Sequence, residues 1–321
     1  MSRSDRLLSS VLQAIGETPL VELSRLSSGL EGRILAKLEY LNPGGSKKDR
    51  IARSILEAAA RDGDLAPGQP VIELTSGNTG TGAAIVCAVQ RRPFIAVMSR
   101  GNSIERARMM AALGAEVVLV DQAAGSPPGQ VSGEDLALVE AETVRLAKAR
   151  GAFRIDQFLR EASSAAHENG TGPEIWRQSG GEVTAFCDFV GSGGTFAGIK
   201  RAFTKLAPQV RGYVVEPEGA APLAGLAVTS PNHPIQGGGY SMADLPLLEQ
   251  VEPDGYVQVT EDEAIRAARR LAREEGVFGG FSAGANVAAA IKLLDGVERG
   301  GVIAVLICDT GLKYLSTDLW A

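Results

Sequence analysis

The stretch that decides the fold is VIELTSGNTGTGAAIVCAVQ, residues 71–90, where a short apolar run passes through a glycine-rich turn into a helical pattern. The first part is short, apolar and followed at once by small turn residues, which predicts a buried strand. The second part predicts a helix that follows this strand directly. A strand leading into a helix is the unit from which parallel α/β sheets are built.

The same alternation extends outward in both directions. Helical periodicity separates the apolar runs, as in DRIARSILEAAARDG and SIERARMMAALG, and a Gly/Pro/Ser-rich loop at 122–133 precedes a further helix. We therefore expect an α/β protein with a first domain over 1–150, a second over 151–321, and part of 13–40 packing with the second. The predicted strands are ILAKLEY, VIELTS, FIAVMS, EVVLVD, AFCDFVGS, RGYVVEPE and VIAVLIC.

Composition limits the classes of function. The 321 residues carry a net charge of -6, which argues against a dedicated nucleic-acid surface. No apolar run is long enough for a membrane span or a signal peptide, so we expect a cytoplasmic protein without a membrane partner. The 3 cysteines are far apart and only 2 histidines are present, so we expect neither disulfides nor a metal site.

Three glycine-rich turns and a pair of lysines could carry chemistry. In NPGGSKKDR, residues 42–50, a lysine at a helix N-terminus would have its ammonium disfavoured by the helix dipole, which suits an imine-forming lysine. Two solvated lysines in a turn are the alternative. TSGNTG at 75–80 and GSGGT at 191–195 each lie between a strand and a helix, where backbone N–H groups bind anions. In FSAGA, Ser282 could instead be an ordinary helix cap.

A dinucleotide site is the competing interpretation of GSGGT, because Glu216 ends the next strand where a ribose-binding acid could lie. The glycine spacing differs from GxGxxG, however, and this interpretation leaves the lysine pair and the TSGNTG turn unexplained. A binding protein that has lost turnover was the other alternative to an enzyme. The intact lysine and both turns argue against it.

Taken in order, these segments resemble the cysteine synthase and cystathionine β-synthase family of fold-type II pyridoxal-phosphate enzymes, over almost the whole chain. The resemblance implies a tryptophan synthase β-like fold of two α/β domains with mostly parallel sheets and the active site in the cleft between them. The matching motifs are IGETPLVEL, NPGGSKKDRIA, ELTSGNTGTGAA, NSIERARMMAALGAEVVL, DQF, HENGTGPEIW, VGSGGT, IQGGGY, EEGVFGGFSAGA and DTGLKYLST.

The resemblance also implies roles for single residues. Lys48 would be the Schiff-base lysine and the proton-transferring catalytic residue, and Ser282 would face the pyridine nitrogen of pyridoxal 5'-phosphate. The other cofactor-binding residues would be Asn78, Gly191, Ser192, Gly193, Gly194 and Thr195. The substrate-binding residues would be Thr75, Ser76, Gly77, Thr79, Gln157, Gly237 and Tyr240.

The implied reaction is β-replacement on a serine-derived amino acid through an aminoacrylate intermediate. A cysteine synthase using O-acetylserine or O-phosphoserine and sulfide is the main expectation, with a cystathionine β-synthase or a diaminopropionate-type synthase with an amine nucleophile as alternatives. Tyr240 is a weak hint toward the cystathionine β-synthases. Lys47 departs from the family, and its charge either alters the pKa of Lys48 or points to solvent. The family further implies a homodimer acting on a small molecule.

Overall fold

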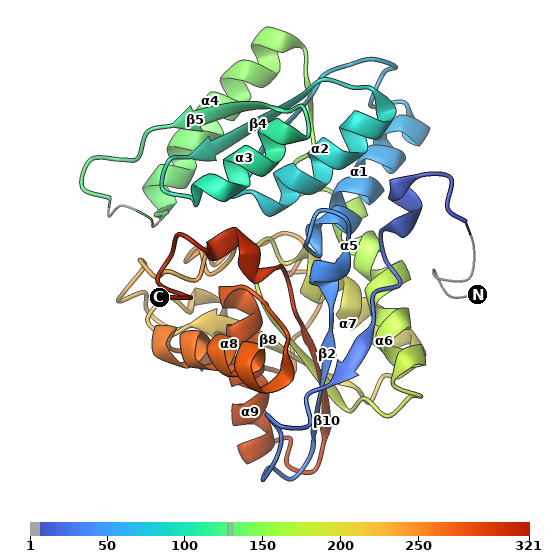
Figure 1. The fold of residues 1–321 in the computed structure, drawn as a ribbon, viewed down its shortest axis with the longest axis vertical. Helices are drawn as coiled ribbons and strands as arrows, with labels where there is room; N and C mark the ends of the chain where they lie inside the picture. Colours follow the sequence, from blue (N-terminus) through green and yellow to red (C-terminus); the bar gives the residue numbers. More distant parts are fainter. Residues whose placement is uncertain (1–6, 127–128, 130) are drawn as a thin grey trace.

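The computed structural model describes residues 7–126, 129 and 131–321, and these form two sheets with helices packed against them (Figure 1). The larger sheet has the strand order β1-β2-β10-β7-β8-β9 and the smaller has β5-β4-β3-β6. All neighbours are parallel except β1 and β2, which pair antiparallel. The prediction of an α/β fold with two mostly parallel sheets is therefore confirmed.

The strand bounds follow the predicted apolar runs except at β1, β6 and β9, which were not predicted. The larger sheet contains β1 (Leu20–Glu22), β2 (Arg33–Lys37), β7 (Ala185–Phe189), β8 (Arg211–Pro217), β9 (Gly255–Val259) and β10 (Val302–Leu306). The smaller sheet contains β3 (Val71–Leu74), β4 (Phe94–Ser99), β5 (Glu116–Val120) and β6 (Phe153–Arg154).

Helices lie between most strands. Those of the first half are α1 (Lys48–Asp62), α2 (Asn78–Gln90), α3 (Ile104–Ala112) and α4 (Gly133–Arg150). Those of the second half are α5 (Ala162–Ala166), α6 (Gly172–Gln178), α7 (Gly194–Leu206), α8 (Glu261–Glu275) and α9 (Phe281–Asp295). Shorter turns are η2 (Val11–Ala14), η3 (Glu39–Leu41), η5 (Pro222–Ala224), η6 (Gly311–Tyr314) and a π-helix, η4 (His167–Thr171).

Three strands lie in the sheet of the other predicted domain. β1 and β2 lie in the larger sheet although they come early in the chain, and β6 lies in the smaller sheet although it begins at Phe153. The domain ranges 1–150 and 151–321 remain a prediction. The loop expected at 122–133 precedes α4, whose Ser132 and Asp135 form a capping box. Residues 127, 128 and 130 of that loop lie outside the described residues.

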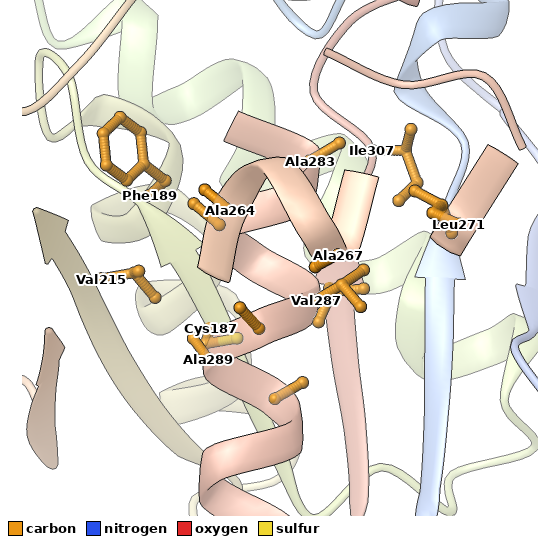
Figure 2. Close-up of a cluster of buried hydrophobic side chains, with 14 of the residues drawn as sticks. Cys187, Phe189, Val215, Ala264, Ala267, Leu271, Ala283, Val287, Ala289 and Ile307 are labelled. Carbon is orange, nitrogen blue, oxygen red and sulfur yellow. The ribbon is translucent and has the colours of Figure 1, made fainter. Parts of the chain in front are cut away.

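The larger core lies where α8 and α9 pack on the six-stranded sheet (Figure 2). α9 is apolar around most of its circumference, and residues such as Val287 and Ala289 are fully buried. α8 crosses it closely, because a Cβ at Gly284 would lie 2.0 Å from the Ala264 carbonyl oxygen. This packing fixes the N-terminus of α9, which carries Ser282.

Candidate active site

The predicted site residues lie at strand ends and helix beginnings. β3 leads through the TSGNTG turn into α2, β7 leads through GSGGT into α7, and Lys48 is the first residue of α1. In parallel sheets the carboxyl ends of the strands and the N-termini of the following helices share one edge. Turns that are far apart in the sequence therefore surround common cavities.

One cavity of about 430 Å³ brings most of the predicted cofactor residues together. Lys48 and Ser282 line it together with the GSGGT turn. Within that turn, Gly194 is buried and does not line the cavity. The residues around it are Lys47, Lys48, Asn78, Asp188, Phe189, Gly191, Ser192, Gly193, Thr195, Gln236, Gly237, Ser282 and Cys308.

A second cavity of about 360 Å³ shares part of this wall, including Lys48 and Asn78. Thr79 and Gln157 line it side by side, because the Thr79 hydroxyl donates to Gln157 Oε1 across 2.7 Å. Ser76, Gly237 and Tyr240, which were predicted to bind substrate, complete this wall. The amine of Lys48 therefore faces both the expected cofactor residues and the expected carboxylate residues.

Lys48 has an environment that favours a neutral amine. It is partly exposed because it faces the cavities, yet burial of its amine and, second, the neighbouring ammonium of Lys47 together lower its pKa from 10.5 to about 8. The position at the start of α1 adds to this effect, because the helix dipole disfavours a cation there. A lysine near this pKa can accept and return a proton close to neutral pH.

Lys47 points away from solvent, which decides between the two alternatives left open by the sequence. Its Nζ lies 2.7 Å from Asp188 Oδ1 and 2.9 Å from Oδ2, and both side chains are buried. Burial lowers the pKa of Lys47, but the Asp188 carboxylate outweighs it and gives a net rise. The single charge in the apolar strand AFCDF was the sequence signal for this partner, and we did not identify it.

The TSGNTG turn is stabilised mainly by its own side chains. Thr75 Oγ1 accepts hydrogen bonds from the N–H groups of Gly77 and Gly80, each at 2.9 Å. Gly77 has φ +126°, and a Cβ there would lie 2.5 Å from Cδ of the buried Arg106. Arg106 Nη1 in turn donates to the Ser76 carbonyl across 2.6 Å. Gly77 and Thr75 therefore shape the turn, and neither of them lines the two cavities described above.

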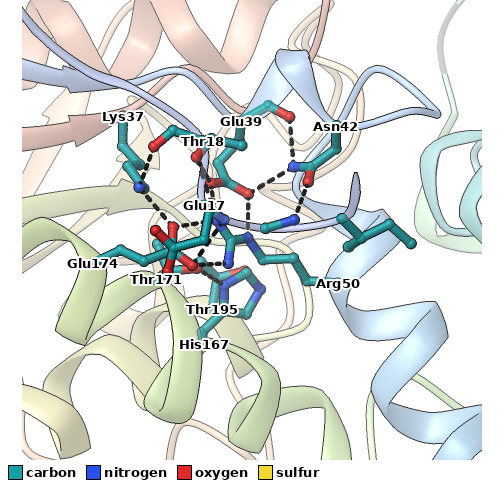
Figure 3. Close-up of polar contacts among 12 residues, drawn as sticks. Glu17, Thr18, Lys37, Glu39, Asn42, Arg50, His167, Thr171, Glu174 and Thr195 are labelled. Atoms are coloured by element: carbon teal, nitrogen blue, oxygen red, sulfur yellow. Dashed lines mark hydrogen bonds and ion pairs between the residues drawn. The ribbon is translucent and has the colours of Figure 1, made fainter. Parts of the chain in front are cut away.

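A buried histidine contacts the last residue of the GSGGT turn. His167, fully buried in the π-helix, lies 3.2 Å from Thr195 Oγ1 through Nε2 and 2.8 Å from Thr171 Oγ1 through Nδ1 (Figure 3). Burial lowers the pKa of His167 well below 6.5, so the ring is neutral. Gly193 has φ +83°, which allows the backbone to turn directly into α7.

Asn78 and Ser282 occupy the remaining walls. The Asn78 amide donates to Asp309 Oδ2 across 2.8 Å and accepts from Lys313 Nζ across 2.7 Å, which fixes its orientation. Burial lowers the pKa of Lys313 to about 8. Ser282 contacts the Cys308 thiol, whose pKa burial raises to about 11. Asp309 and Lys313 belong to the motif DTGLKYLST, which carried part of the family resemblance but predicted no role for either residue. Cys308 directly precedes that motif and was expected only to be a buried cysteine.

Helix α1 is anchored by a buried ionic network (Figure 3). Arg50 donates two hydrogen bonds to Glu39, at 2.8 and 2.7 Å, and two to Glu174, at 2.6 and 2.7 Å. Lys37 Nζ lies 2.7 Å from Glu174 Oε2. The network joins α1 to η3 and α6, so it fixes the helix that begins at Lys48.

A third cavity of about 880 Å³ opens beside the other two and shares Gln236, Gly237 and Tyr240 with them. Thr75 and Ser76 line it together with the segment 231–241. Three buried polar atoms on this segment have no hydrogen-bond partner within the described ranges, namely His233 Nδ1, Gln236 Oε1 and Ser241 Oγ. Such atoms mark places where a bound molecule can form hydrogen bonds.

The position of Glu216 argues against a dinucleotide site. Its carboxylate accepts from the N–H groups of Leu223 and Ala224, at 3.0 and 2.9 Å, and so closes the loop after β8.

Within residues 7–126, 129 and 131–321, no helix has both the length and the apolar character that a membrane span requires. The same ranges contain no group of three or more potential metal ligands.

Comparisons with known proteins agree with this geometry. The family model described as pyridoxal-phosphate dependent enzyme matches residues 11–309. The chain is 39% identical over 313 residues to cysteine synthase 3 of Caenorhabditis elegans, covering 96% of this chain and 88% of the relative.

Two solved structures are similar along the whole fold. One is an O-acetyl serine sulfhydrylase isoform 3 from Entamoeba histolytica, with TM-score 0.89, 34% identity, and coverage of 100% of this chain and 93% of that chain. The other is an O-ureido-L-serine synthase, with TM-score 0.88, 36% identity, and coverage of 98% and 96%.

Proposed function

The chain belongs to the pyridoxal-phosphate dependent enzyme family, and from that premise we propose that it is a cysteine synthase, which replaces the acetate of O-acetylserine with sulfide. It is an enzyme of β-replacement. The cofactor is pyridoxal 5'-phosphate, and the substrate is a small amino acid. The assignment of single residues to cofactor and substrate, and the choice of substrate pair, are our proposals.

The residues present fit the cofactor by the chemistry of their donor groups. The first N–H groups of α7 have no acceptor within the helix and would hold the phosphate, together with the hydroxyls of Ser192 and Thr195. The glycines leave room for it, because a Cβ at Gly191 would come 2.7 Å from the Gly237 carbonyl oxygen. Ser282 would meet the pyridine nitrogen and Asn78 the ring hydroxyl.

When bound, pyridoxal phosphate supplies an aldehyde that holds the substrate amine and a ring that withdraws electrons from the α-carbon. The Lys48 amine would take the proton from the α-carbon, and it carries that proton while acetate leaves from the β-carbon with the bonding electron pair. Sulfide then forms the new bond at the β-carbon. Lys48 finally returns its proton to the α-carbon. Ser282, which lines this cavity, would orient the ring through its hydroxyl without adding a charge.

The substrate carboxylate would lie at the beginning of α2. The helix N-terminus attracts an anion, and the Thr79 and Gln157 side chains stand at the same cavity wall as Lys48. Their mutual hydrogen bond fixes both groups before the substrate arrives. The α-carbon is thereby held near the Lys48 amine.

The charge of the surrounding walls favours O-acetylserine over O-phosphoserine. Among the described residues that line the three cavities, the lysines and acids are Lys47, Lys48 and Asp188, and Lys47 is already paired with Asp188. A phosphate leaving group would be buried without a free cation, which is costly. A zwitterionic second substrate such as homocysteine would meet the same difficulty, which argues against a cystathionine β-synthase.

The observation that carries the proposal is the position of the Lys48 amine between the α7 and α2 N-termini. The purified protein should show the visible absorbance of bound cofactor, change it on addition of O-acetylserine, and release L-cysteine when sulfide is added. Serine and O-phosphoserine should be poorer donors. A Lys48→Ala control should form no product. Equal turnover with O-phosphoserine would contradict the choice of donor, and a protein that binds no cofactor would contradict the whole proposal.

A nitrogen-containing nucleophile is a second candidate, favoured by the three polar atoms without a hydrogen-bond partner that line the third cavity. His233 Nε2 donates to the Gly239 carbonyl oxygen, which leaves Nδ1 as an acceptor, and Gln236 Oε1 is also an acceptor. Two neutral acceptors suit an uncharged molecule with N–H groups better than sulfide. Hydroxyurea, which carries N–H groups and would form the new bond through its hydroxyl oxygen to give O-ureido-L-serine, is a suitable probe. Product ratios from mixtures with sulfide would decide between the candidates.

A homodimer in the cytoplasm is proposed on the family resemblance alone. Light scattering on the purified holoenzyme would report a mass near twice that of the 33.5 kDa chain. A monomer would contradict this part of the proposal and leave the chemistry unaffected.

A further inference from the structure

Two adjacent lysines line the cofactor cavity, and only one is used in the proposed reaction. Lys47 precedes α1 and Lys48 begins it. The Lys47 ammonium is 2.7 Å from Asp188, which lies near the end of β7. Lys47 and Asp188 are 7% and 1% exposed, so the pair is almost completely removed from water.

The presence of this buried ion pair calls for a reason other than stability. Removing two charges from water costs about as much as their attraction returns, so apolar side chains at the same place would be equally stable or more stable. Either charge alone would be strongly unfavourable there. The two residues therefore act together.

The pair connects the segments that carry the two halves of the cofactor site. Lys47 immediately precedes Lys48, and its backbone N–H donates to the Cys308 carbonyl oxygen across 2.9 Å. Asp188 is followed by the residues that lead into GSGGT. The Cys308 thiol lies 3.9 Å from Asp188 Oδ1, so it closes the space beside the pair. The ion pair thus holds the base of Lys48 against the strand that leads to the phosphate turn.

The pair also balances charge around the Lys48 amine. After burial, the Lys47 ammonium lowers the pKa of Lys48, whereas Asp188 from β7, Cys308 after β10 and Glu73 from β3 raise it. The π-helix adds His167, whose pKa is lowered by burial and by several cations that include both lysines. Lys47 and Asp188 act on the pKa of Lys48 in opposite directions. Removing one of these charges should therefore shift the pKa of Lys48, whereas the effects of removing both should largely cancel.

We propose that Lys47 and Asp188 form a charge-compensated positioning pair, which orients Lys48 toward the cofactor and keeps the charge around its amine balanced. The inference rests on the proposed role of Lys48 as the cofactor-bearing residue. It concerns residues that do not react themselves. Sequence variation at one position of the pair would then require compensation at the other.

The test is a double-mutant cycle of Lys47→Met, Asp188→Asn and both together, with Arg299→Met as the control. Arg299 pairs with Glu31 at 2.8 Å on the surface, with both side chains 67% exposed. In the cofactor-free form of the full chain, the pH dependence of lysine labelling by an amine-reactive reagent is followed at Lys48 by peptide mass spectrometry. Thermal melting and pyridoxal phosphate affinity are measured on the same proteins.

Asp188→Asn should move the labelling midpoint of Lys48 to a pH on the order of 1 unit lower, and Lys47→Met should move it higher by a similar amount. The double variant should return near the parent and melt above at least one single variant, and Arg299→Met should leave the midpoint unchanged. If one single variant does not fold, the labelling midpoints of the double variant and of the other single variant can still be compared with that of the parent. Unchanged Lys48 midpoints, or equal shifts in the same direction, would overturn the proposal. A parent protein without cofactor at Lys48 would instead overturn the proposed function.

Discussion

Arg50 Nη1 donates to Glu174 Oε1 across 2.6 Å, and this contact joins the helix that begins at Lys48 to α6 (Figure 3). The side chains of Arg50 and Glu174 are 5% and 6% exposed. Burial opposes the charge on Glu174, but Arg50 and Lys37 more than compensate and hold the pKa of its carboxyl well below the usual range. Helix α1, and with it Lys48, is thereby tied to a buried ionic network.

Arg50→Met should lower the free energy of unfolding by about 3–5 kcal/mol, because it removes the cation paired with the buried Glu39 and one of the two cations paired with the buried Glu174. The matched change Arg299→Met removes an exposed pair and should cost about 0–1 kcal/mol. Urea denaturation of the cofactor-free proteins measures both. A loss at Arg50 no larger than at Arg299 would mean that the network contributes little to the fold.

His167→Phe should weaken pyridoxal phosphate binding by about tenfold, because it removes roughly one hydrogen bond, the contact from His167 to Thr195 in the GSGGT turn. The ring faces Thr195 on one side and Thr171 on the other. Thr171→Val, which keeps the contact to Thr195, should have a smaller effect. Cofactor titration of the apoprotein gives both affinities, and an unchanged affinity of His167→Phe would exclude a role for the histidine in this turn.

Glu73→Gln should change the pH dependence of stability. Burial raises the pKa of Glu73 from 4.5 to about 7, and the N–H groups of Asp156 and Gln157 oppose this rise only in part. Between these two pH values the folded protein binds more protons than the unfolded chain. The parent should therefore lose stability relative to Glu73→Gln as the pH rises from 4.5 to 7, by on the order of 3 kcal/mol.

The measurement is the difference in unfolding free energy between parent and Glu73→Gln at several pH values. Loss of a backbone contact in the variant adds an offset that does not vary with pH. A difference that stays constant across this range would show that Glu73 titrates normally.

Gly191→Ala should reduce pyridoxal phosphate affinity by about tenfold or more, because the added Cβ would lie 2.7 Å from the Gly237 carbonyl oxygen and force the two turns apart. Gly133→Ala is the control, since a Cβ there meets no atom within 4 Å. Isothermal titration of the apoproteins compares the two. Equal affinities would mean that the turns move apart without affecting the cofactor.

Much of the fold was predictable because it follows from local patterns. The runs that became β3, β4, β7 and β8 are apolar and bounded by turns, and the helices between them have clear periodicity. β1, β6 and β9 were not predicted. β1 and β6 are only 3 and 2 residues long, and β9 is a partly exposed strand at the sheet edge, so none gives a strong local pattern.

The sequence by itself determined the candidate chemical groups: a lysine at a helix start, two glycine-rich turns between a strand and a helix, and a serine at a helix N-terminus, each visible within a few residues. Only the tertiary structure decided the surroundings of that chemistry. Lys47 could have pointed to solvent, but it pairs with Asp188, 141 residues away in the chain. Local periodicity carries no information on such distant contacts, because they depend on how β7 and α1 pack once both sheets have formed.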